Sequence, residues 1–373
     1  MSDIEIKKLR DFDDLTISET DKREARKKFS AFQRQVRENA KLKKCILCGK
    51  DCSSFCNSHT IPQFVLKKIA KNGELVTGMS LLENPLIDKE VGIKKTITFN
   101  IICNDCDNTL FQEYEDPNAY NKKISMQMIQ KIALKNHLRM LAKRLQEIEN
   151  YKMLFDSMID NYGLEFDGES MIDIQAFIEH TKVDSIDIID FSREIENNLN
   201  GKTKYHVIDE IDLNYVVPIA FQGTLNLVSG FNGELINDIY NYDEKYKLLD
   251  LQVVIFPLEN KTKIVLFKED GVDRLKYFYK EYNKLTLNER LYVINYILLL
   301  YTEDYAINPE FLENNNINEE TYNLIKTTSN SMSVEGLVMT KEEYKKKAIK
   351  LVCDTHKLEK SGNIFNFLID RNL

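Results

Sequence analysis

The sequence predicts an α+β protein, with a small metal-stapled module near its N-terminus and a larger mixed α+β domain after it. Three observations lead to this class. Two Cys-x-x-Cys pairs, Cys45-Ile-Leu-Cys48 and Cys103-Asn-Asp-Cys106, lie in the first third of the chain. Apolar residues recur at helical spacing from 122 to about 155. Strand-like segments then fill residues 204–267.

The length and composition bound the class of protein. The 373 residues are enough for more than one domain, and we divide them into 1–44 (acidic N-terminus and basic helix), 45–116 (metal module), 117–200 (helical region) and 201–373 (α+β domain). No apolar run reaches the roughly 18 residues that a membrane span needs. The N-terminus lacks the pattern of a signal peptide. We therefore expect a cytoplasmic protein without membrane contact.

The first element expected is a basic helix over residues 21–44. Its apolar residues repeat at helical spacing, at Phe29, Phe32 and Val36. The segment holds ten Lys or Arg against three acids, although the whole chain has a net charge of −8. Because local basic density governs phosphate contact, it is a candidate nucleic-acid surface, through Lys27, Lys28 and Arg34. Alternatively, the helix packs on the core and its basic face is only solvated.

The two cysteine pairs predict a structural zinc site. A structural, tetrahedral Zn²⁺ can be bound by four thiolates. Two tight turns that each present two sulfurs therefore complete its coordination shell. Six of the seven cysteines lie between 45 and 106, whereas a disulfide framework would spread them along the chain. We expect Zn²⁺ at Cys45, Cys48, Cys103 and Cys106. Cys52 and Cys56 are alternative ligands or small buried apolar groups.

The remaining elements follow from local patterns. Residues 62–71 predict a short helix, with Lys67 and Lys68 adding to the basic surface, 72–92 an extended loop and 94–102 a strand. A helix starts just after Cys106. Strands are expected at 205–208, 215–220, 225–228, 251–256 and 263–267, with a hairpin turn between the last two. One helix is expected at about 287–302 and two more within 318–360.

Cys45-x-x-Cys48, His59-Thr-Ile-Pro62 and Cys103-x-x-Cys106 together resemble the cysteine-containing HNH endonucleases, over about residues 45–115. The resemblance implies a ββα-metal finger of treble-clef type. It also implies phosphodiester hydrolysis, in which His59 takes a proton from water while a single Mg²⁺ or Mn²⁺, held by Asp107, sits on the scissile phosphate. Asn108 and Asn100 are further candidate catalytic residues by the same resemblance.

Three positions depart from the family's pattern. Ser58 stands before the His where the family has a carboxylate, and a hydroxyl is a poorer ligand for a hard cation. Asp107 stands directly after the second pair, where Asn or His is common, so its carboxylate would hold the ion instead. Asn100 is not at the offset of the Asn that orients the His. Glu113 and Glu115 either add carboxylates to the site or are solvated.

Two hypotheses of function result. The first is a metal-dependent endonuclease that acts on double-stranded DNA, in defence against foreign DNA. The second is a non-catalytic zinc module that binds nucleic acid or a protein partner, while the C-terminal domain supplies recognition or a homo-oligomer contact. The two differ in the place of His59, which either lies beside Asp107 as a general base or serves as a zinc ligand or structural residue.

Overall fold

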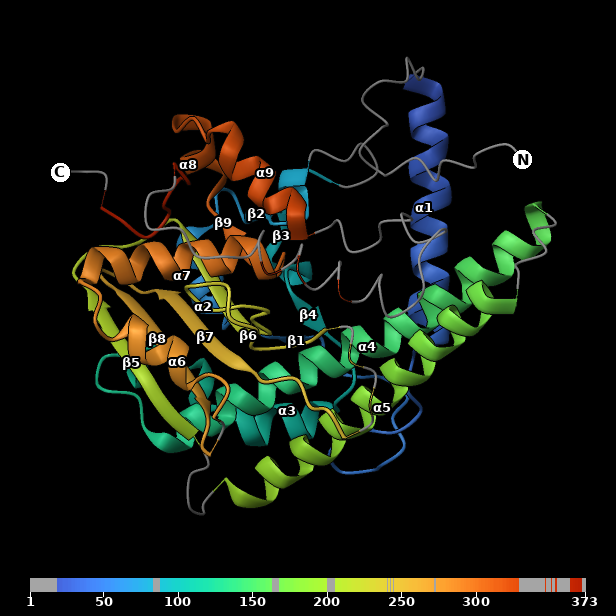
Figure 1. Cartoon of the computed structure of the whole chain (residues 1–373), viewed down its shortest axis with the longest axis horizontal. Helices are drawn as coiled ribbons and strands as arrows, with labels where there is room; N and C mark the ends of the chain where they lie inside the picture. Colours follow the sequence, from blue (N-terminus) through green and yellow to red (C-terminus); the bar gives the residue numbers. More distant parts are fainter. Residues whose placement is uncertain are drawn as a thin grey trace.

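A seven-stranded sheet lies at the centre of the molecule. The structure is a computed structural model, and it describes residues 19–82, 88–162, 168–199, 205–239, 241, 243, 245–271, 273–328, 346, 350, 353 and 363–370. Neighbouring strands are antiparallel. With the helices around it, the sheet makes the mixed α+β fold that the sequence predicts (Figure 1). In spatial order the strands are β3 (Val91–Gly92), β2 (Glu74–Thr77), β9 (Tyr305–Ile307), β6 (Ile219–Leu225), β7 (Leu251–Pro257), β8 (Thr262–Glu269) and β5 (Tyr205–Leu213).

The strands of the C-terminal part agree only partly with the predicted segments. β7 and β8 form the expected hairpin, whose register pairs Leu251 with Lys268 and Pro257 with Thr262. The prediction of two separate strands at 215–220 and 225–228 was wrong. A single strand, β6, replaces them, because it pairs with β9 along its first half and with β7 along its second.

Helices cover both faces of the sheet (Figure 1). Along β7, Val253 and Ile255 point into one core and Val254 and Phe256 into the other, as side-chain alternation on a strand requires. The second core is closed by α4 (Met126–Tyr162) and by the cysteine module. The first core is closed by α6 (Lys276–Tyr282), α7 (Leu287–Tyr301) and α9 (Glu319–Thr328), with α8 (Pro309–Asn314) just before α9.

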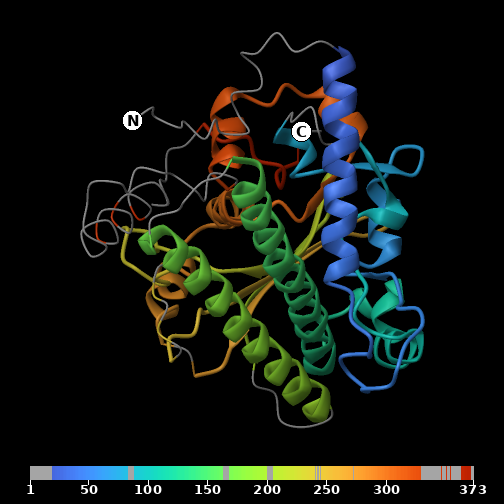
Figure 2. The same ribbon diagram turned by 90° about the vertical axis from the view of Figure 1, so that its right-hand side faces the viewer.

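Two long helices extend beyond the sheet. α4 and α5 (Gly168–Asn198) run alongside each other, and α1 (Glu19–Asn39) packs against α4 (Figure 2). α1 is the predicted basic helix, except that it ends at Asn39 and not near residue 44. Val36 is buried against the rest of the molecule. In the part of the chain that the structure describes, no helix is both long and apolar enough to cross a membrane.

The segment between the cysteine pairs joins the module to the sheet. α2 (Gln63–Ile69) forms as predicted, but β2 and β3 lie where the sequence predicts an extended loop. β2 pairs with β9, with Val76 opposite Ile307, so a partner from far along the chain makes a strand of a segment whose local signal is weak. The strand predicted over 94–102 shortens to β4 (Thr98–Phe99), which follows the 3₁₀ turn η3 (Ile93–Lys95).

The cysteine module shares the second core with the sheet. Phe99 and Phe111 pack in the same buried cluster as Val254 and Phe256. α3 (Asn104–Phe111) begins within the second cysteine pair. The 3₁₀ turns η4 (Glu113–Glu115) and η5 (Pro117–Tyr120) then lead into α4. The shared core fixes the module against α4, while the domain boundaries at 45, 117 and 201 stay a prediction.

Candidate metal centre and the site around His59

The four cysteines of the two pairs come together at one point. Their sulfur atoms all lie within 4.8 Å of one another. The Cys45–Cys106 and Cys48–Cys103 sulfur pairs are each 3.8 Å apart. A tetrahedral Zn²⁺ with Zn–S bonds of about 2.3 Å needs sulfurs about 3.8 Å apart. The predicted cluster is confirmed, and its donor set fits a structural Zn²⁺.

Local backbone geometry explains why these turns present sulfur inward. Gly49 follows the first pair at φ +69°, a conformation that costs glycine nothing, and its N–H donates to the Cys45 carbonyl at 2.9 Å. The Cys103 N–H donates to the Cys45 sulfur at 3.3 Å. Burial raises the pKa of Cys45, but N–H donors from Cys48, Cys103 and Leu47 outweigh it and lower the pKa to about 7. The first turn therefore favours thiolate at Cys45, whereas burial and the neighbouring sulfurs raise the pKa of Cys106.

The two additional cysteines point away from this cluster. The Cys52 thiol donates to the Lys50 carbonyl at 3.5 Å. The Cys56 thiol donates to Asp107 Oδ2 at 3.4 Å. Burial, followed by the charge of Asp107, raises the pKa of Cys56 to about 12, so it stays a thiol. Neither belongs to the four-cysteine group found among the described residues.

His59 lies beside the metal cluster and not in it. It ends β1 (Ser58–His59), which pairs with β4, so His59 faces Thr98 across the ladder. The side chain is buried, with 4% exposed. Nε2 lies 2.9 Å from the Ile93 carbonyl, and Nδ1 lies 3.2 Å from the Gln63 amide nitrogen. We assign the proton to Nε2, because a carbonyl only accepts, which leaves the Nδ1 lone pair to the Gln63 amide.

Gln63 separates Nδ1 of His59 from solvent. It is the first residue of α2 and is exposed. Its backbone N–H donates to Glu115 Oε2 at 3.2 Å, which holds the start of α2 against η4. Because the amide of this exposed side chain is the hydrogen-bond partner of Nδ1, rotation of that side chain would free Nδ1 for another partner.

We expect His59 to make the fold less stable as the pH falls. Burial lowers the pKa of His59 from its ordinary 6.5. Below about pH 6.5 the unfolded chain therefore binds a proton that the folded chain does not, so the free energy of unfolding decreases between pH 6.5 and the lower pKa of the folded state. Urea unfolding of wild type and of His59→Gln at pH 7.5 and 5.5 measures this, and wild type should lose more stability than the variant.

Acid loss of zinc affects both proteins alike, so the difference between them isolates the imidazole. His206→Gln is a matched control, because His206 is exposed on β5. Equal losses in wild type and His59→Gln would show that the pKa of His59 is not lowered by folding.

Asp107, in the first turn of α3, binds the residue before the histidine. The Ser58 hydroxyl donates to Asp107 Oδ1 at 2.6 Å. With the Cys56 thiol on Oδ2, both carboxylate oxygens have a donor. Ser58 stands where the HNH pattern has an acid, and the structure shows that it binds the acid contributed by α3. Burial lowers the pKa of His59 overall, and the charge of Asp107 opposes that effect only in part.

Lys135 of α4 completes the site, and sequence analysis missed it. The side chain is 1% exposed. Its ammonium donates to the His59 carbonyl at 3.0 Å. It lies 3.7 Å from Asp107 Oδ1 and 3.7 Å from Glu115 Oε1. A signal existed in the sequence, because three polar residues, 135–137, interrupt an otherwise apolar stretch of the helix.

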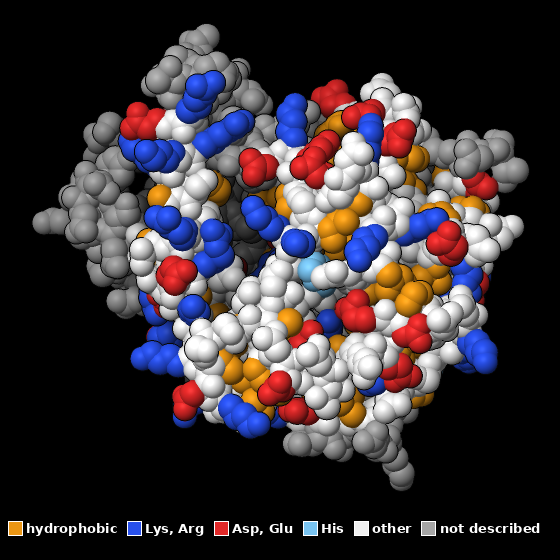
Figure 3. Space-filling view, turned by 180° about the vertical axis from the view of Figure 1, so that it is seen from behind, with side chains coloured by type: hydrophobic (Ala, Val, Ile, Leu, Met, Phe, Trp, Pro, Cys, Tyr) orange, Lys and Arg blue, Asp and Glu red, His pale blue; other side chains and the backbone are white. Residues whose placement is uncertain are grey.

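The other candidate residues lie at the surface. Asn100 and Asn108 are exposed, and neither contacts the ring nitrogens of His59. Figure 3 shows Lys and Arg side chains spaced along α1, on the left of that view. The predicted nucleic-acid contacts are all exposed, namely Lys27, Lys28, Arg34, Lys67 and Lys68. Sequence analysis missed two further exposed lysines, Lys94 and Lys95, which directly follow the residue whose carbonyl holds His59.

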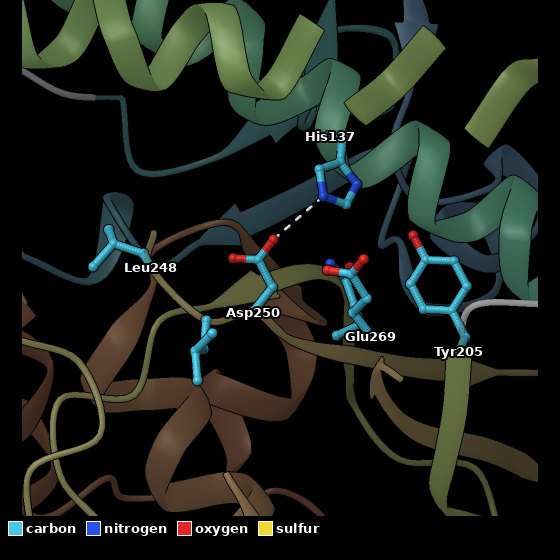
Figure 4. Close-up of a pocket in the computed structure, with 7 residues that line it drawn as sticks. His137, Tyr205, Leu248, Asp250 and Glu269 are labelled. Atoms are coloured by element: carbon cyan, nitrogen blue, oxygen red, sulfur yellow. Dashed lines mark ion pairs between the residues drawn. The ribbon is translucent and has the colours of Figure 1, made fainter. Parts of the chain in front are cut away.

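A buried polar chain leads from this site to a small cavity. The Tyr114 hydroxyl donates to Gln222 at 2.6 Å, Gln222 to Asn136 at 2.8 Å, and Asn136 to Gln252 at 2.7 Å. Gln252 lines a cavity of about 40 Å³, which has room for water but not for a nucleotide (Figure 4). The other lining residues are His137, Tyr205, Leu248, Leu249, Asp250 and Glu269.

Comparison of the chain with protein-family models, with curated proteins and with solved structures finds no match in any of the three. What the site can do must therefore be argued from its own geometry. That geometry brings together the four cysteines at one point. It brings His59, Ser58, Asp107 and Lys135 together at a second point beside it.

Proposed function

We propose that the chain is a nuclease in which a zinc-stapled ββα finger of the HNH type hydrolyses phosphodiester bonds. The order of elements supports this, since β1 pairs with β4 and α3 follows, with one cysteine pair before β1 and the other at the start of α3. The observation that carries the proposal is the state of His59. It lies outside the zinc cluster, and its Nε2 is held by a backbone carbonyl.

In the proposed reaction His59 accepts a proton at Nδ1 from the water that attacks phosphorus, the P–O bond to the leaving sugar oxygen breaks, and that oxygen takes a proton from solvent. The Ile93 carbonyl fixes the ring and stabilises the Nε2–H as the imidazole becomes positive. The lowered pKa of His59 keeps the base unprotonated at neutral pH. The Gln63 side chain must first turn away, so that water can take its position at Nδ1.

The carboxylates near His59 do not fit the Mg²⁺ or Mn²⁺ ion that the resemblance implies. Both oxygens of Asp107 accept hydrogen bonds, from Ser58 and Cys56. Asp107 and Glu115 also face the Lys135 ammonium, each at 3.7 Å. Mg²⁺ needs oxygen ligands at about 2.0–2.1 Å, and these carboxylate oxygens already face hydrogen-bond donors and an ammonium. The proposed reaction therefore has no step at such an ion.

The proposed substrate is nucleic acid, with double-stranded DNA as the first choice and defence against foreign DNA in the cytoplasm as the proposed role. The exposed basic side chains of α1 support this, as do Lys67, Lys94 and Lys95 around His59. Such residues position a duplex through its phosphates without reading bases. A protein partner or homo-oligomer contact through residues 201–373 stays a prediction.

A second candidate function is a zinc module that binds nucleic acid or a protein partner without cleaving it. Two observations favour it. Ser58 replaces the acid expected before the histidine. The Ser58 hydroxyl and the Cys56 thiol also donate hydrogen bonds to both oxygens of Asp107, the carboxylate that would hold an ion. The two functions predict similar binding and differ in cleavage.

Cleavage assays separate the two candidates. Supercoiled plasmid, single-stranded DNA and single-stranded RNA would each be incubated with the zinc-loaded chain, with Mg²⁺, with Mn²⁺ and without added ion. Nicked, linear or shortened products support the nuclease. Binding in a gel-shift assay without cleavage of any substrate would reject the nuclease and support the non-catalytic binding module.

We expect the basic face of α1 to contribute electrostatic affinity for DNA. Reversing Lys27, Lys28 and Arg34 to Glu should weaken binding and reduce the slope of log K against log salt by about three units, roughly 0.9 for each lost phosphate contact. Fluorescence anisotropy between low and high salt measures the slope. The control reverses three exposed lysines in and just after α6, on the other side of the sheet: Lys276, Lys280 and Lys284. An unchanged slope in the α1 variant would make α1 a packing element.

A further inference from the structure

The cation at the centre of the His59 site belongs to the chain itself. Lys135 reaches it from α4, and its ammonium meets one carbonyl and two carboxylates, from His59, Asp107 and Glu115. We propose that the Lys135 ammonium is the built-in cation of this site, in the position that a divalent ion would take, and that the folded chain binds no divalent ion between Asp107 and Glu115.

The surroundings of the ammonium match its chemistry. One of its N–H groups donates to the His59 carbonyl at 3.0 Å, and the carboxylates of Asp107 and Glu115 lie within ion-pair distance, at 3.7 Å each. The rings of Phe111 and Tyr114 lie under it, with 4.6 Å and 4.7 Å from nitrogen to ring centroid, within the range of cation–π attraction. Burial lowers the pKa of Lys135, and the charges of Asp107 and Glu115, which favour the ammonium, oppose this effect.

The position of Lys135 is fixed by the helix that carries it. Ile132, Leu134 and Leu138 of α4 are buried in the second core. The next residue, Asn136, is held at both ends of its amide by Gln222 and Gln252 of the sheet. The ammonium therefore cannot leave the site without displacing a packed helix turn or folding its own side chain against the core.

The size of the site also fits an ammonium better than a metal ion. Both carboxylates stand 3.7 Å from the nitrogen. Mg²⁺ takes oxygens at about 2.0–2.1 Å and Ca²⁺ at about 2.3–2.6 Å. An ion at the nitrogen's position would require both acidic side chains to move inward by more than 1 Å.

The proposal concerns the same carboxylates as the proposed nuclease. It does not depend on cleavage, because its test measures ion binding. If the chain cuts no nucleic acid, the nuclease proposal fails while the ion measurement still decides the role of Lys135.

The first test uses the wild-type chain with its zinc. Mn²⁺ is the probe, because it prefers oxygen ligands and does not compete for four thiolates. Electron paramagnetic resonance of free Mn²⁺ during a titration should show no ion bound stoichiometrically. One bound Mn²⁺ per chain that disappears in Asp107→Asn would overturn the proposal, whatever the variants below do.

The second test removes the cation. Lys135→Met removes the cation that faces both carboxylates and leaves only neutral donors on them, so the variant should melt at a lower temperature and should gain one Mn²⁺ site. Saturating Mn²⁺ should raise its melting temperature by about 5 °C, the order expected for a ligand at 100 times its Kd, and should leave wild type unchanged. The gain should vanish in the double variant Lys135→Met, Asp107→Asn.

Lys131→Met is the matched control. Lys131 lies one turn earlier on α4 and pairs with Glu113 at 2.7 Å, at the edge of the same site. It should gain no Mn²⁺ site. If Lys131→Met and Lys135→Met respond alike to Mn²⁺, or if Lys135→Met folds and gains no site, the ammonium does not hold the position of an ion. If Lys135→Met does not fold, the wild-type titration decides.

Discussion

Replacing Cys103 by serine is expected to release the zinc and to unfold the cysteine module. Structural zinc contributes roughly 10–16 kcal/mol of apparent binding free energy in isolated zinc-finger peptides, and in such sites this energy is folding energy. Cys103 also caps α3, where its sulfur accepts the Cys106 N–H at 3.5 Å. Because Phe99 and Phe111 lie in the core shared with the sheet, loss of the module should also destabilise β6 and β7.

Zinc content and urea unfolding of the purified variant measure this effect. Cys52→Ser is the matched control, because Cys52 lies between the same two pairs but points to the Lys50 carbonyl. It should keep one zinc per chain and wild-type stability. A Cys103→Ser variant with full zinc and normal stability would contradict the four-cysteine assignment.

Replacing His59 by alanine should abolish cleavage by the proposed nuclease and preserve the fold. Loss of a general base typically costs on the order of 100-fold or more in rate. Apart from the imidazole's own contact with the Ile93 carbonyl, this part of β1 is held through its backbone, by the Lys135 ammonium on the His59 carbonyl and by the Thr60 N–H, which donates to the Ile97 carbonyl. Removing the imidazole leaves those contacts in place, so zinc content and DNA affinity should stay unchanged.

Single-turnover cleavage of a labelled duplex measures the rate, and zinc analysis and anisotropy check the other two properties. His206→Ala is the control, because it removes an exposed histidine of β5 and leaves the buried His59 in place. If His59→Ala releases zinc, the imidazole supports the metal cluster. If it cleaves at the wild-type rate, another group is the base.

Several features were predictable from the sequence because their causes are local. A Cys-x-x-Cys turn presents two sulfurs through its own backbone, so the members of the four-cysteine cluster followed from their spacing. The β7–β8 hairpin is joined by a short turn. α7 begins with a capping box, in which Thr286 and Glu289 satisfy each other's backbone N–H groups within one helical turn.

Other features depended on partners from distant parts of the chain. β2 is a strand because β9 offers it a free edge, and residues 72–92 carry too little local signal to predict it. Asp107 was expected to face an ion, but Ser58 and Cys56, which precede it by some fifty residues, occupy its oxygens. Asn100 and Asn108 were candidates only because they lie near the positions of the HNH pattern, and in the tertiary structure both are exposed and neither contacts the ring nitrogens of the imidazole.

Sequence by itself determined the four-cysteine cluster, the basic helix and the place of His59 between the two cysteine pairs. Only the tertiary structure decided which groups surround that histidine. Lys135 shows the physical reason. A lysine within an apolar helix looks unfavourable in isolation, because burying an unpaired ammonium is costly. Three oxygens and two aromatic rings from β1, α3 and η4 offset that cost, and they meet only when the whole chain has folded.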